Sequence, residues 1–237
     1  MPPLRFGAVG DVHGEFEALA RVMARHPEVA FWVSVGDVAS DDGRYPEPVA
    51  PLYWIKGNNE DFGFIGRLLA GDAHMENLRY LANGTRTEIG GLSVAALGGT
   101  FAPTWYDTRA DALPFPGGSP PACAGAARSR AVRDDKRRHF VRAEVEACKA
   151  MRGIDLFLSH EAPRPFFVPT GRGRTDAGRT AINEVLHVMA PRLHLCGHHH
   201  QFRDDVRQGV RSVALDLVLR SYLLLDAATL EYERRET

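Results

Sequence analysis

Side chains that can bind metal ions follow five apolar, strand-like segments of this chain, each directly after a Gly or a Ser. They are Asp11, Asp37, Asn58, His160 and His198. In α/β proteins, ligands collect at the carboxyl ends of strands, where the loops leave the core. Glycine permits the tight turns that bring side chains together there. We therefore expect these five positions to meet at one site, although they lie far apart in the sequence.

Two more histidines extend this set. His13 lies two residues after Asp11, and His200 lies two residues after His198. Alternate residues of an extended segment point the same way, so His198 and His200 should converge while His199 faces elsewhere. The complete set then holds two carboxylates, one carboxamide oxygen and four imidazoles.

A mixed oxygen and nitrogen set without a thiolate suits Mn²⁺, Fe or Zn²⁺ better than Ca²⁺ or Cu(I). Seven ligands are more than one ion usually takes, but they suit two ions that share a bridging ligand. Two metal ions about 3.5–4 Å apart can activate a bridging hydroxide and hold phosphate oxygens during an in-line displacement. We therefore expect two divalent metal ions, with Mn²⁺ favoured and Fe or Zn²⁺ as alternatives.

Each of these residues taken alone has a simpler explanation. Asp11 and Asp37 could be helix N-caps or turn residues, because Asp often has that role after a strand. His160 could be a buried histidine with satisfied hydrogen bonds, and His13 alone is uninformative. Only the joint occurrence of all these positions favours metal binding.

Hydrophobic patterning predicts the elements that must position the site. Apolar runs predict strands at 4–9, 30–35, 51–55, 154–158 and 193–196, with further β-rich segments at 210–217 and 221–226. Helical spacing of apolar residues appears within 15–25, 140–148 and 181–189. A Gly-Gly step between 86–89 and 92–97 predicts a β-hairpin. Strands that alternate with helices favour βαβ units and a sheet covered by helices.

A Pro/Gly-rich insertion at about 101–133 interrupts this pattern. It contains Pro103, Pro114, Pro116, Pro120 and Pro121. This density of helix and strand breakers predicts no regular element within 101–130. Long loops of this kind are often lids or binding loops, and the alternative is a solvated insertion. Because no break in composition marks a second unit, we expect one domain over residues 1–237.

Composition limits the classes of partner. The formal net charge of the 237 residues is −1, so no global field attracts nucleic acid or an anionic membrane. No apolar run approaches the ~18 residues that span a bilayer, and the first residues lack the layout of a signal peptide. Three cysteines at wide spacing argue for a reducing compartment rather than a disulfide framework. We therefore expect a cytoplasmic protein without a membrane partner.

Five short motifs occur in a fixed order, each after an apolar strand. They are GDVHG at 10–14, GD at 36–37, GNNE at 57–60, SHEAP at 159–163 and GHHH at 197–200. In this order they resemble the calcineurin-like metallophosphoesterase superfamily over roughly residues 5–225. The resemblance implies an α/β fold, namely a four-layer αββα sandwich of two mixed β-sheets flanked by helices.

The resemblance also divides the seven residues between two metal ions. It assigns Asp11, His13 and His200 to the first ion, Asn58, His160 and His198 to the second, and Asp37 to both as a bridge. It implies a metal-dependent hydrolase of phosphoester bonds in which a hydroxide between the metals is the nucleophile.

Asn59 is the one departure from the family pattern, which usually has a His at this place as a general acid or a donor to the transition state. A carboxamide can donate a hydrogen bond to a phosphate oxygen, but it cannot deliver a proton to a leaving group. Catalysis should then depend less on leaving-group protonation, or a loop should supply another acid. His74 and His199 are the candidates for that acid.

Arginines are the candidates for contacts with the substrate phosphate. Arg172, Arg174 and Arg179 follow the SHEAP motif in a Gly-rich segment. The planar guanidinium group suits phosphate binding, and a flexible surface segment is the alternative. A basic stretch at 128–138 could make a local contact with nucleic acid, or it could be the solvated start of a helix.

For the substrate, phosphodiesters of the nucleotide or nucleic-acid type are favoured over monoesters. The SHEAP motif and the 90–99 hairpin segment look like the arrangement in lariat-debranching-type and nuclease-type members of the family. The debranching enzyme, however, usually has Cys where His13 stands. Asn59 keeps one alternative open, a non-catalytic, metal-binding scaffold of the same fold.

Overall fold

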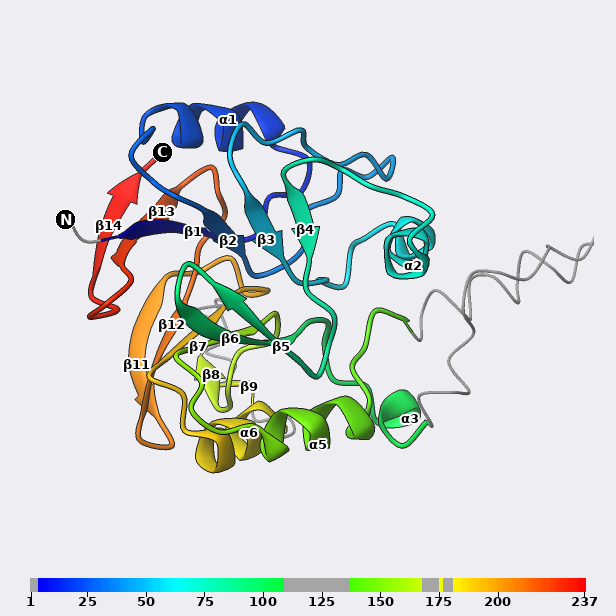
Figure 1. The fold of residues 1–237 in the computed structure, drawn as a ribbon. Helices are drawn as coiled ribbons and strands as arrows, with labels where there is room; N and C mark the ends of the chain where they lie inside the picture. The colour runs from blue at the N-terminus through cyan, green and yellow to red at the C-terminus, as the bar shows by residue number, and fades with distance from the viewer. Residues whose placement is uncertain (1–3, 109–136, 168–174, 177–180) are drawn as a thin grey trace, which may run out of the picture.

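Two six-stranded sheets pack face to face between layers of helix (Figure 1). The computed structural model describes residues 4–108, 137–167, 175–176 and 181–237. The strand order is β14-β13-β1-β2-β3-β4 in the first sheet and β11-β12-β10-β7-β6-β5 in the second. This arrangement confirms the predicted α/β fold of two mixed sheets flanked by helices.

The first sheet is parallel at its centre. The four strands β1 (Arg5–Val9), β2 (Trp32–Ser34), β3 (Leu52–Trp54) and β4 (Leu78–Tyr80) run parallel. The antiparallel strands β13 (Ser221–Asp226) and β14 (Tyr232–Glu236) complete the sheet beside β1. Two helices belong to this half, α1 (Phe16–Ala24) and α2 (Phe62–Ala70). In Figure 1, α1 lies above the sheet.

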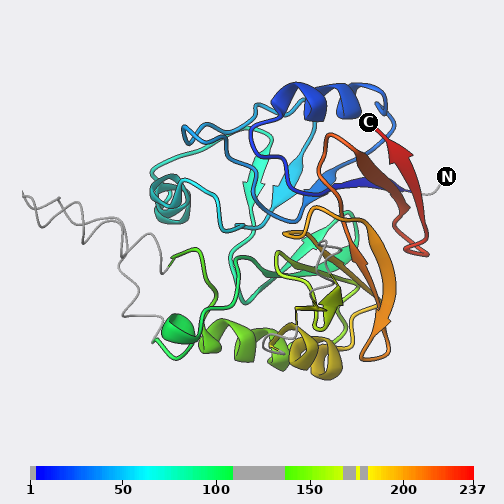
Figure 2. The ribbon, with the colours of Figure 1, turned by 180° about the vertical axis from the view of Figure 1, so that it is seen from behind.

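The second sheet has the same mixed character. The strands β6 (Leu92–Leu97), β7 (Leu156–Ser159), β10 (Leu193–Cys196) and β12 (Val210–Ala214) run parallel. Its edges are the antiparallel strands β5 (Thr85–Ile89) and β11 (Arg203–Arg207). The helices α5 (Arg142–Ala150) and α6 (Ala181–Met189) cover its outer face, and the view from behind in Figure 2 shows the same layers. A two-stranded ribbon pairs β8 (Phe166–Phe167) with β9 (Thr175–Asp176).

Three apolar clusters separate the four layers. The cluster between the sheets includes Ala8, Val94 and Leu195. A second cluster joins the first sheet to α1 and α2, and a third joins the second sheet to α5 and α6. Side chains of a strand alternate between its two faces, as in β6, where Val94 faces the other sheet and Ala95 faces the helices. The sandwich therefore explains why so many strands read as continuous apolar runs.

The sequence patterns predicted the central strands, the 86–97 hairpin and the helices α1, α5 and α6, all of which the structure confirms. The absence of regular structure within 101–130 was wrong for its described part, because α3 (Pro103–Tyr106) is a short helix. Proline fits the first turn of a helix, where its missing N–H has no intrahelical partner. Residues 109–136 lie outside the described residues.

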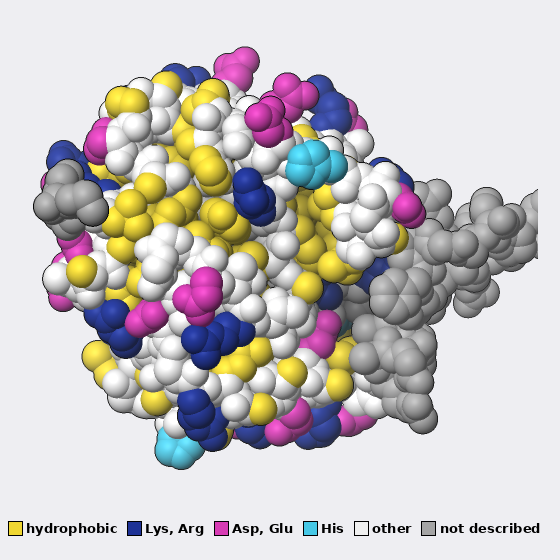
Figure 3. All heavy atoms as spheres, in the orientation of Figure 1, with side chains coloured by type: hydrophobic (Ala, Val, Ile, Leu, Met, Phe, Trp, Pro, Cys, Tyr) yellow, Lys and Arg dark blue, Asp and Glu magenta, His cyan; other side chains and the backbone are white. Residues whose placement is uncertain are grey.

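Charged side chains of both signs are interspersed on the face shown in Figure 3. Among the described residues, no helix is long and apolar enough to cross a membrane. A cytoplasmic location stays a prediction from the sequence.

Candidate metal centre

The ends of five strands, from both sheets, meet at one place between the sheets. From the first sheet, β1 leads to Asp11 and His13, β2 to Asp37 and β3 to Asn58. From the second sheet, the neighbouring strands β7 and β10 lead to His160 and to the 198–200 segment. Because these strands are parallel within each sheet, their carboxyl ends lie along one edge.

Asp11, His13 and His200 form one compact group, with one ligand atom of each residue within 4.8 Å of the others. The Nε2 atoms of His13 and His200 are 3.1 Å apart. His200 Nε2 lies 3.3 Å from Asp11 Oδ2, and His13 Nε2 lies 3.6 Å from Asp37 Oδ2. These are the residues that the family resemblance assigned to the first ion, with Asp37 beside them.

Asp11, Asp37 and His160 form a second compact group by the same measure. The His160 Nδ1 atom is 2.8 Å from the Val35 carbonyl oxygen. Since a carbonyl oxygen only accepts, Nδ1 carries the proton and Nε2 has a free lone pair. This Nε2 lies 2.9 Å from Asn58 Oδ1 and 3.6 Å from Asp37 Oδ2. Two atoms with lone pairs and a carboxylate therefore face one another.

His198 belongs to neither compact group, although it lies beside them. Its ring stands edge-on to the ring of His160, with centroids 5.0 Å apart. Its backbone N–H donates to Asp11 Oδ2 at 2.9 Å. His198 therefore holds Asp11 in place through its backbone, while its imidazole borders the second group.

Strained backbone turns bring these side chains together. His13, Asp37, His198 and His200 all have φ between 47° and 70°, a left-handed conformation that is costly for residues other than Gly. The loops also touch: the backbone N–H groups of Val12 and His13 donate to the Asp37 carbonyl oxygen at 3.0 and 2.7 Å. Such strain persists only where the surroundings fix it, as these hydrogen bonds do.

Glycine is required where the loops approach most closely. A Cβ atom on Gly57 would overlap Asp37 Oδ1, and one on Gly197 would lie 2.7 Å from Asp11 Oδ1. The glycines of the GNNE and GHHH motifs therefore leave room for the two carboxylates.

The two carboxylates differ in electrostatic environment. Burial, and then the neighbouring Asp37, raise the pKa of Asp11 well above its usual range. Burial also acts to raise the pKa of Asp37, but His160 and two hydrogen bonds from Asn59 outweigh it and lower this pKa. Among the described residues, no Lys or Arg side chain forms an ion pair with either carboxylate.

Burial favours the neutral form of three of these histidines, His160, His198 and His200. Burial lowers the pKa of His198 to about 3 and also lowers the pKa values of His160 and His200. A neutral imidazole has the lone pair that a metal ion needs.

These observations fit a cationic ligand. Buried carboxylates without a cationic partner are unfavourable, and the facing lone pairs of His160 and Asn58 repel each other unless a cation lies between them. Ligand atoms about 2.1 Å from one ion lie roughly 3 Å from each other, which matches the separations of 2.9 and 3.1 Å within the groups.

Asn59 is bound to Asp37. Its backbone N–H donates to Asp37 Oδ1 at 2.7 Å, and its side-chain amide donates to Asp37 Oδ2 at 2.9 Å. Both oxygens of the carboxylate are therefore oriented by one residue. We expected the Asn59 amide to donate a hydrogen bond to a substrate phosphate, whereas in the structure it donates to Asp37.

Sequence reasoning missed Glu60, the last residue of the GNNE motif. Its carboxylate accepts hydrogen bonds from the backbone N–H groups of Val38, Ala39 and Gly57, at 3.0 to 3.2 Å. Burial raises the pKa of Glu60 to about 8. Glu60 thus ties the loop after β2 to the loop after β3, and its place within the motif was the signal that could have revealed it.

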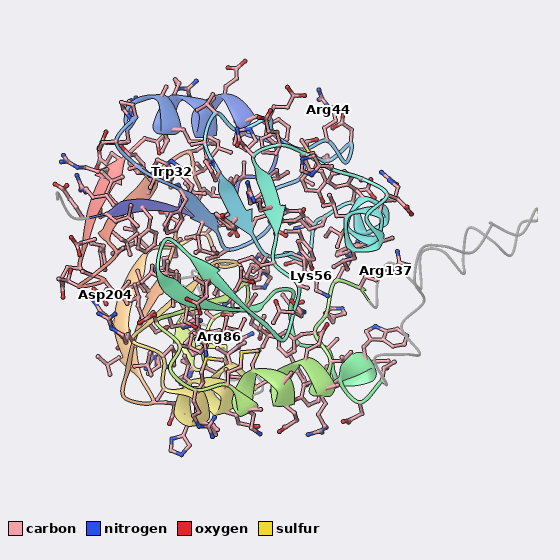
Figure 4. The ribbon with its side chains drawn as sticks, viewed as in Figure 1. Trp32, Arg44, Lys56, Arg86, Arg137 and Asp204 are labelled. Carbon is pink, nitrogen blue, oxygen red and sulfur yellow. The ribbon has the colours of Figure 1, made fainter. Side chains whose placement is uncertain are left out.

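Lys56 was also missed. Its ammonium group donates to the carbonyl oxygens of Arg137 and His139 at 2.8 and 3.1 Å. Figure 4 shows Lys56 and Arg137 near each other beside the end of β3. Lys56 therefore anchors the chain where it returns from the insertion.

Other candidates from the sequence are not brought into the centre. His74 is exposed and lies in the connection before β4. It is therefore at the amino-terminal ends of the parallel strands, whereas Asn58 is at their carboxyl ends. The ring of His199 stacks on Phe166, with centroids 4.2 Å apart. Arg172, Arg174 and Arg179 lie outside the described residues.

Comparison with known proteins decides the family. The family model for calcineurin-like phosphoesterases matches residues 4–202. This chain belongs to the calcineurin-like phosphoesterase family. The calcineurin-like phosphoesterases use divalent metal ions, and the compact groups described above are candidate ligands for them.

Individual relatives of this calcineurin-like phosphoesterase are distant. The lariat debranching enzyme of Schizosaccharomyces pombe is 24% identical over 212 residues, which cover 80% of this chain and 42% of that enzyme. This chain thus spans about two fifths of the length of the debranching enzyme. One crystal structure superposes with a TM-score of 0.68 at 13% identity, over 99% of both chains. The protein TT1561 of Thermus thermophilus has a TM-score of 0.52 at 15% identity, also over 99% of both chains.

Proposed function

We propose that this protein hydrolyses phosphoesters at a centre of two divalent metal ions. The observation that carries this proposal is the meeting of two buried carboxylates with the lone pairs of neutral imidazoles, without an ion pair to any described Lys or Arg. The proposed ligands of one ion are Asp11, His13 and His200, those of the other are Asn58, His160 and His198, and Asp37 bridges them. Mn²⁺ is the proposed native metal, because the set mixes oxygen and nitrogen without sulfur.

When bound, the two ions supply an activated water and positive charge against the phosphate oxygens. The chain's own residues prepare the site for this. Val35 fixes the tautomer of His160 so that Nε2 faces the centre, and Asn59 orients both oxygens of Asp37. Glu60 holds together the two loops that carry Asp37 and Asn58.

Asn59 acts, in this proposal, as a positioning residue for Asp37. Its amide is directed at the carboxylate and has no proton to give to a leaving group. Substrates with good leaving groups, or leaving groups whose charge the metals neutralise, should therefore react best.

For the substrate class we favour phosphodiesters of the nucleotide or nucleic-acid type. The 24% identity with a lariat debranching enzyme over 80% of this chain supports this choice. The family resemblance implies Cys at the place of His13 in debranching enzymes, so we do not extend the proposal to debranching itself. Fold and family do not determine the substrate.

A non-catalytic, metal-binding scaffold is the second candidate, and Asn59 is the residue that favours it. Against it, all seven proposed ligand positions hold side chains that can bind metal. Asn59 also has a definite role in orienting Asp37.

A metal titration followed by an activity screen separates the two candidates. The metal-free protein should bind two Mn²⁺ per chain by calorimetry, and it should then hydrolyse bis-para-nitrophenyl phosphate faster than para-nitrophenyl phosphate. Two bound ions without hydrolysis of these esters or of a panel of nucleotides would favour the scaffold. Absence of metal binding would reject both.

A further inference from the structure

A chain of side-chain hydrogen bonds crosses the second sheet on its helix-facing side. His194 on β10 lies between Ser212 on β12 and Ser159 on β7, with 2.7 Å from Nδ1 to Ser212 Oγ and 2.7 Å from Nε2 to Ser159 Oγ. The Ser159 hydroxyl continues to the Glu161 carbonyl oxygen at 2.6 Å. All three side chains are buried.

The direction of every proton in this chain is determined. The Glu161 carbonyl oxygen only accepts, so the Ser159 hydroxyl donates to it. Ser159 has then used its only proton and must accept from His194 Nε2–H. The Nδ1 atom of His194 is therefore the acceptor, and the Ser212 hydroxyl donates to it. Only one tautomer of a neutral imidazole satisfies all the bonds.

Packing alone does not require these polar groups. The ring of His194 stacks on Phe157 with centroids 5.0 Å apart and an interplanar angle of 22°, and Phe157 belongs to the apolar cluster between this sheet and its helices. A Phe could fill the same position without desolvating a polar ring. A fully satisfied buried network is a way to fix one geometry, and this one ends at the loop that carries His160.

The Ser159 hydroxyl links the two residues on either side of His160. Ser159 precedes His160 and its bond to the Glu161 carbonyl closes a turn around that residue. The carbonyl of His160 itself accepts from the Gly197 N–H at 3.0 Å, which joins the loop after β7 to the loop after β10. A change in the rotamer of Ser159 would therefore move His160 relative to the metal centre.

We infer that His194 is a positioning residue: as a neutral Nε2–H imidazole it holds the Ser159 hydroxyl, and through it the backbone on both sides of His160. The link to metal affinity rests on the proposed function, whereas the tautomer and the hydrogen bonds do not.

Nitrogen-15 NMR of the histidine rings in the metal-free 237-residue chain tests the tautomer. The His194 signals, assigned by their loss in His194→Phe, should show a protonated Nε2 and an unprotonated Nδ1 that do not change between pH 8 and pH 5.5. A protonated Nδ1, or titration in this range, would overturn the inference.

Calorimetry with Mn²⁺ tests the consequence for the centre. Ser159→Ala should lower the affinity for Mn²⁺ roughly tenfold, as loss of residues that orient metal ligands usually does. The matched control is Ser93→Ala on β6 of the same sheet, whose buried hydroxyl has no hydrogen-bond partner among the described residues, and it should bind Mn²⁺ like the wild type. His194→Phe should reproduce the loss of Ser159→Ala.

Wild-type affinity in a folded Ser159→Ala protein would refute the positioning role. If the wild type itself bound no Mn²⁺, the proposed function would fail, and the NMR result would still decide the tautomer. Comparison with Ser93→Ala shows whether the loss of a buried hydroxyl from this sheet is by itself enough to change the affinity for Mn²⁺.

Discussion

At the scale of residues, hydrogen bonds fix the orientation of two side chains in the candidate centre, His160 and Asp37. Val35 selects the tautomer of His160, and Asn59 fixes both oxygens of Asp37. The convergence of the candidate ligand residues was predictable, because each follows an apolar strand in a recognisable motif; their role as metal ligands stays a prediction. The hydrogen bonds of Asn59 and Glu60 were not predictable, because they depend on the path of three loops that the sequence pattern leaves undefined.

Replacement of Asn59 by Ala should weaken metal binding while the protein stays folded. The side-chain bond to Asp37 Oδ2 is lost, so the carboxylate gains rotational freedom, and we expect a roughly tenfold loss of Mn²⁺ affinity by calorimetry. Asn77→Ala, which removes a bond to the distant Pro48 carbonyl, is the control. Unchanged affinity in Asn59→Ala would mean that Asn59 does not position Asp37.

The lowered pKa of His194 should make the free energy of unfolding depend on pH. Burial lowers its pKa from 6.5 to about 3 in the folded state, so between these values the unfolded chain binds the proton and the folded chain does not. His194 therefore leaves the free energy of unfolding unchanged above pH 6.5. Below pH 6.5 it lowers this free energy as the pH falls towards 3, by up to about 1.4 kcal/mol per pH unit.

Denaturant unfolding at pH 7, 6, 5 and 4 measures this dependence. The free energy of unfolding should fall less steeply with decreasing pH in His194→Phe than in the wild type. His198, with a similarly lowered pKa, contributes equally to both proteins and cancels in the comparison. Identical slopes would show that the pKa of His194 is not lowered in the folded protein.

At the scale of elements, most strands and helices with a clear apolar pattern were predicted, whereas two charged edge strands and the glycine-containing helix α2 were missed. The edge strands β11 (RDDVR) and β14 (YERRE) are mostly charged, a common protection of sheet edges against pairing with other chains. Their backbone bonds come from the neighbouring strand, which local sequence cannot reveal. Helix α2 was missed because Gly63 and Gly66 lower its intrinsic helical preference.

Helix α2 follows the GNNE motif directly and begins at a strong cap. The Asp61 side chain accepts from the N–H groups of Gly63 and Phe64 at 2.9 and 3.0 Å, and Gly71 closes the helix in a left-handed conformation. Asp61→Ala should lower the free energy of unfolding by about 1 kcal/mol. Glu15, at the start of α1, makes no side-chain cap, so Glu15→Ala should have no such effect in the same denaturant titration.

At the scale of the whole molecule, the metal centre lies where the two sheets meet. Its proposed ligands come from β1, β2 and β3 of one sheet and from β7 and β10 of the other. Ligands that bind only the folded state stabilise it by mass action, by about 2.7 kcal/mol at a concentration one hundred times the Kd.

Mn²⁺ should therefore raise the Tm of the wild type, and EDTA should reverse the rise. Asp37→Asn should abolish the rise. It should also lower the Tm of the metal-free protein, because the folded chain stabilises the Asp37 carboxylate through His160 and the two hydrogen bonds from Asn59. Differential scanning calorimetry measures both. A similar rise with Mn²⁺ in Asp37→Asn would remove Asp37 from the ligand set.

The pairing of β1 with β13 has a consequence for the order of events during synthesis. The antiparallel partner of residues 5–9, at 221–226, is added more than two hundred residues after them. Until then, one edge of β1 has no partner strand, while the loops that carry Asp11 and Asp37 have already emerged. The nascent chain is therefore exposed to incorrect pairing and to chaperones at β1, and β1 gains its second partner strand only when β13 arrives.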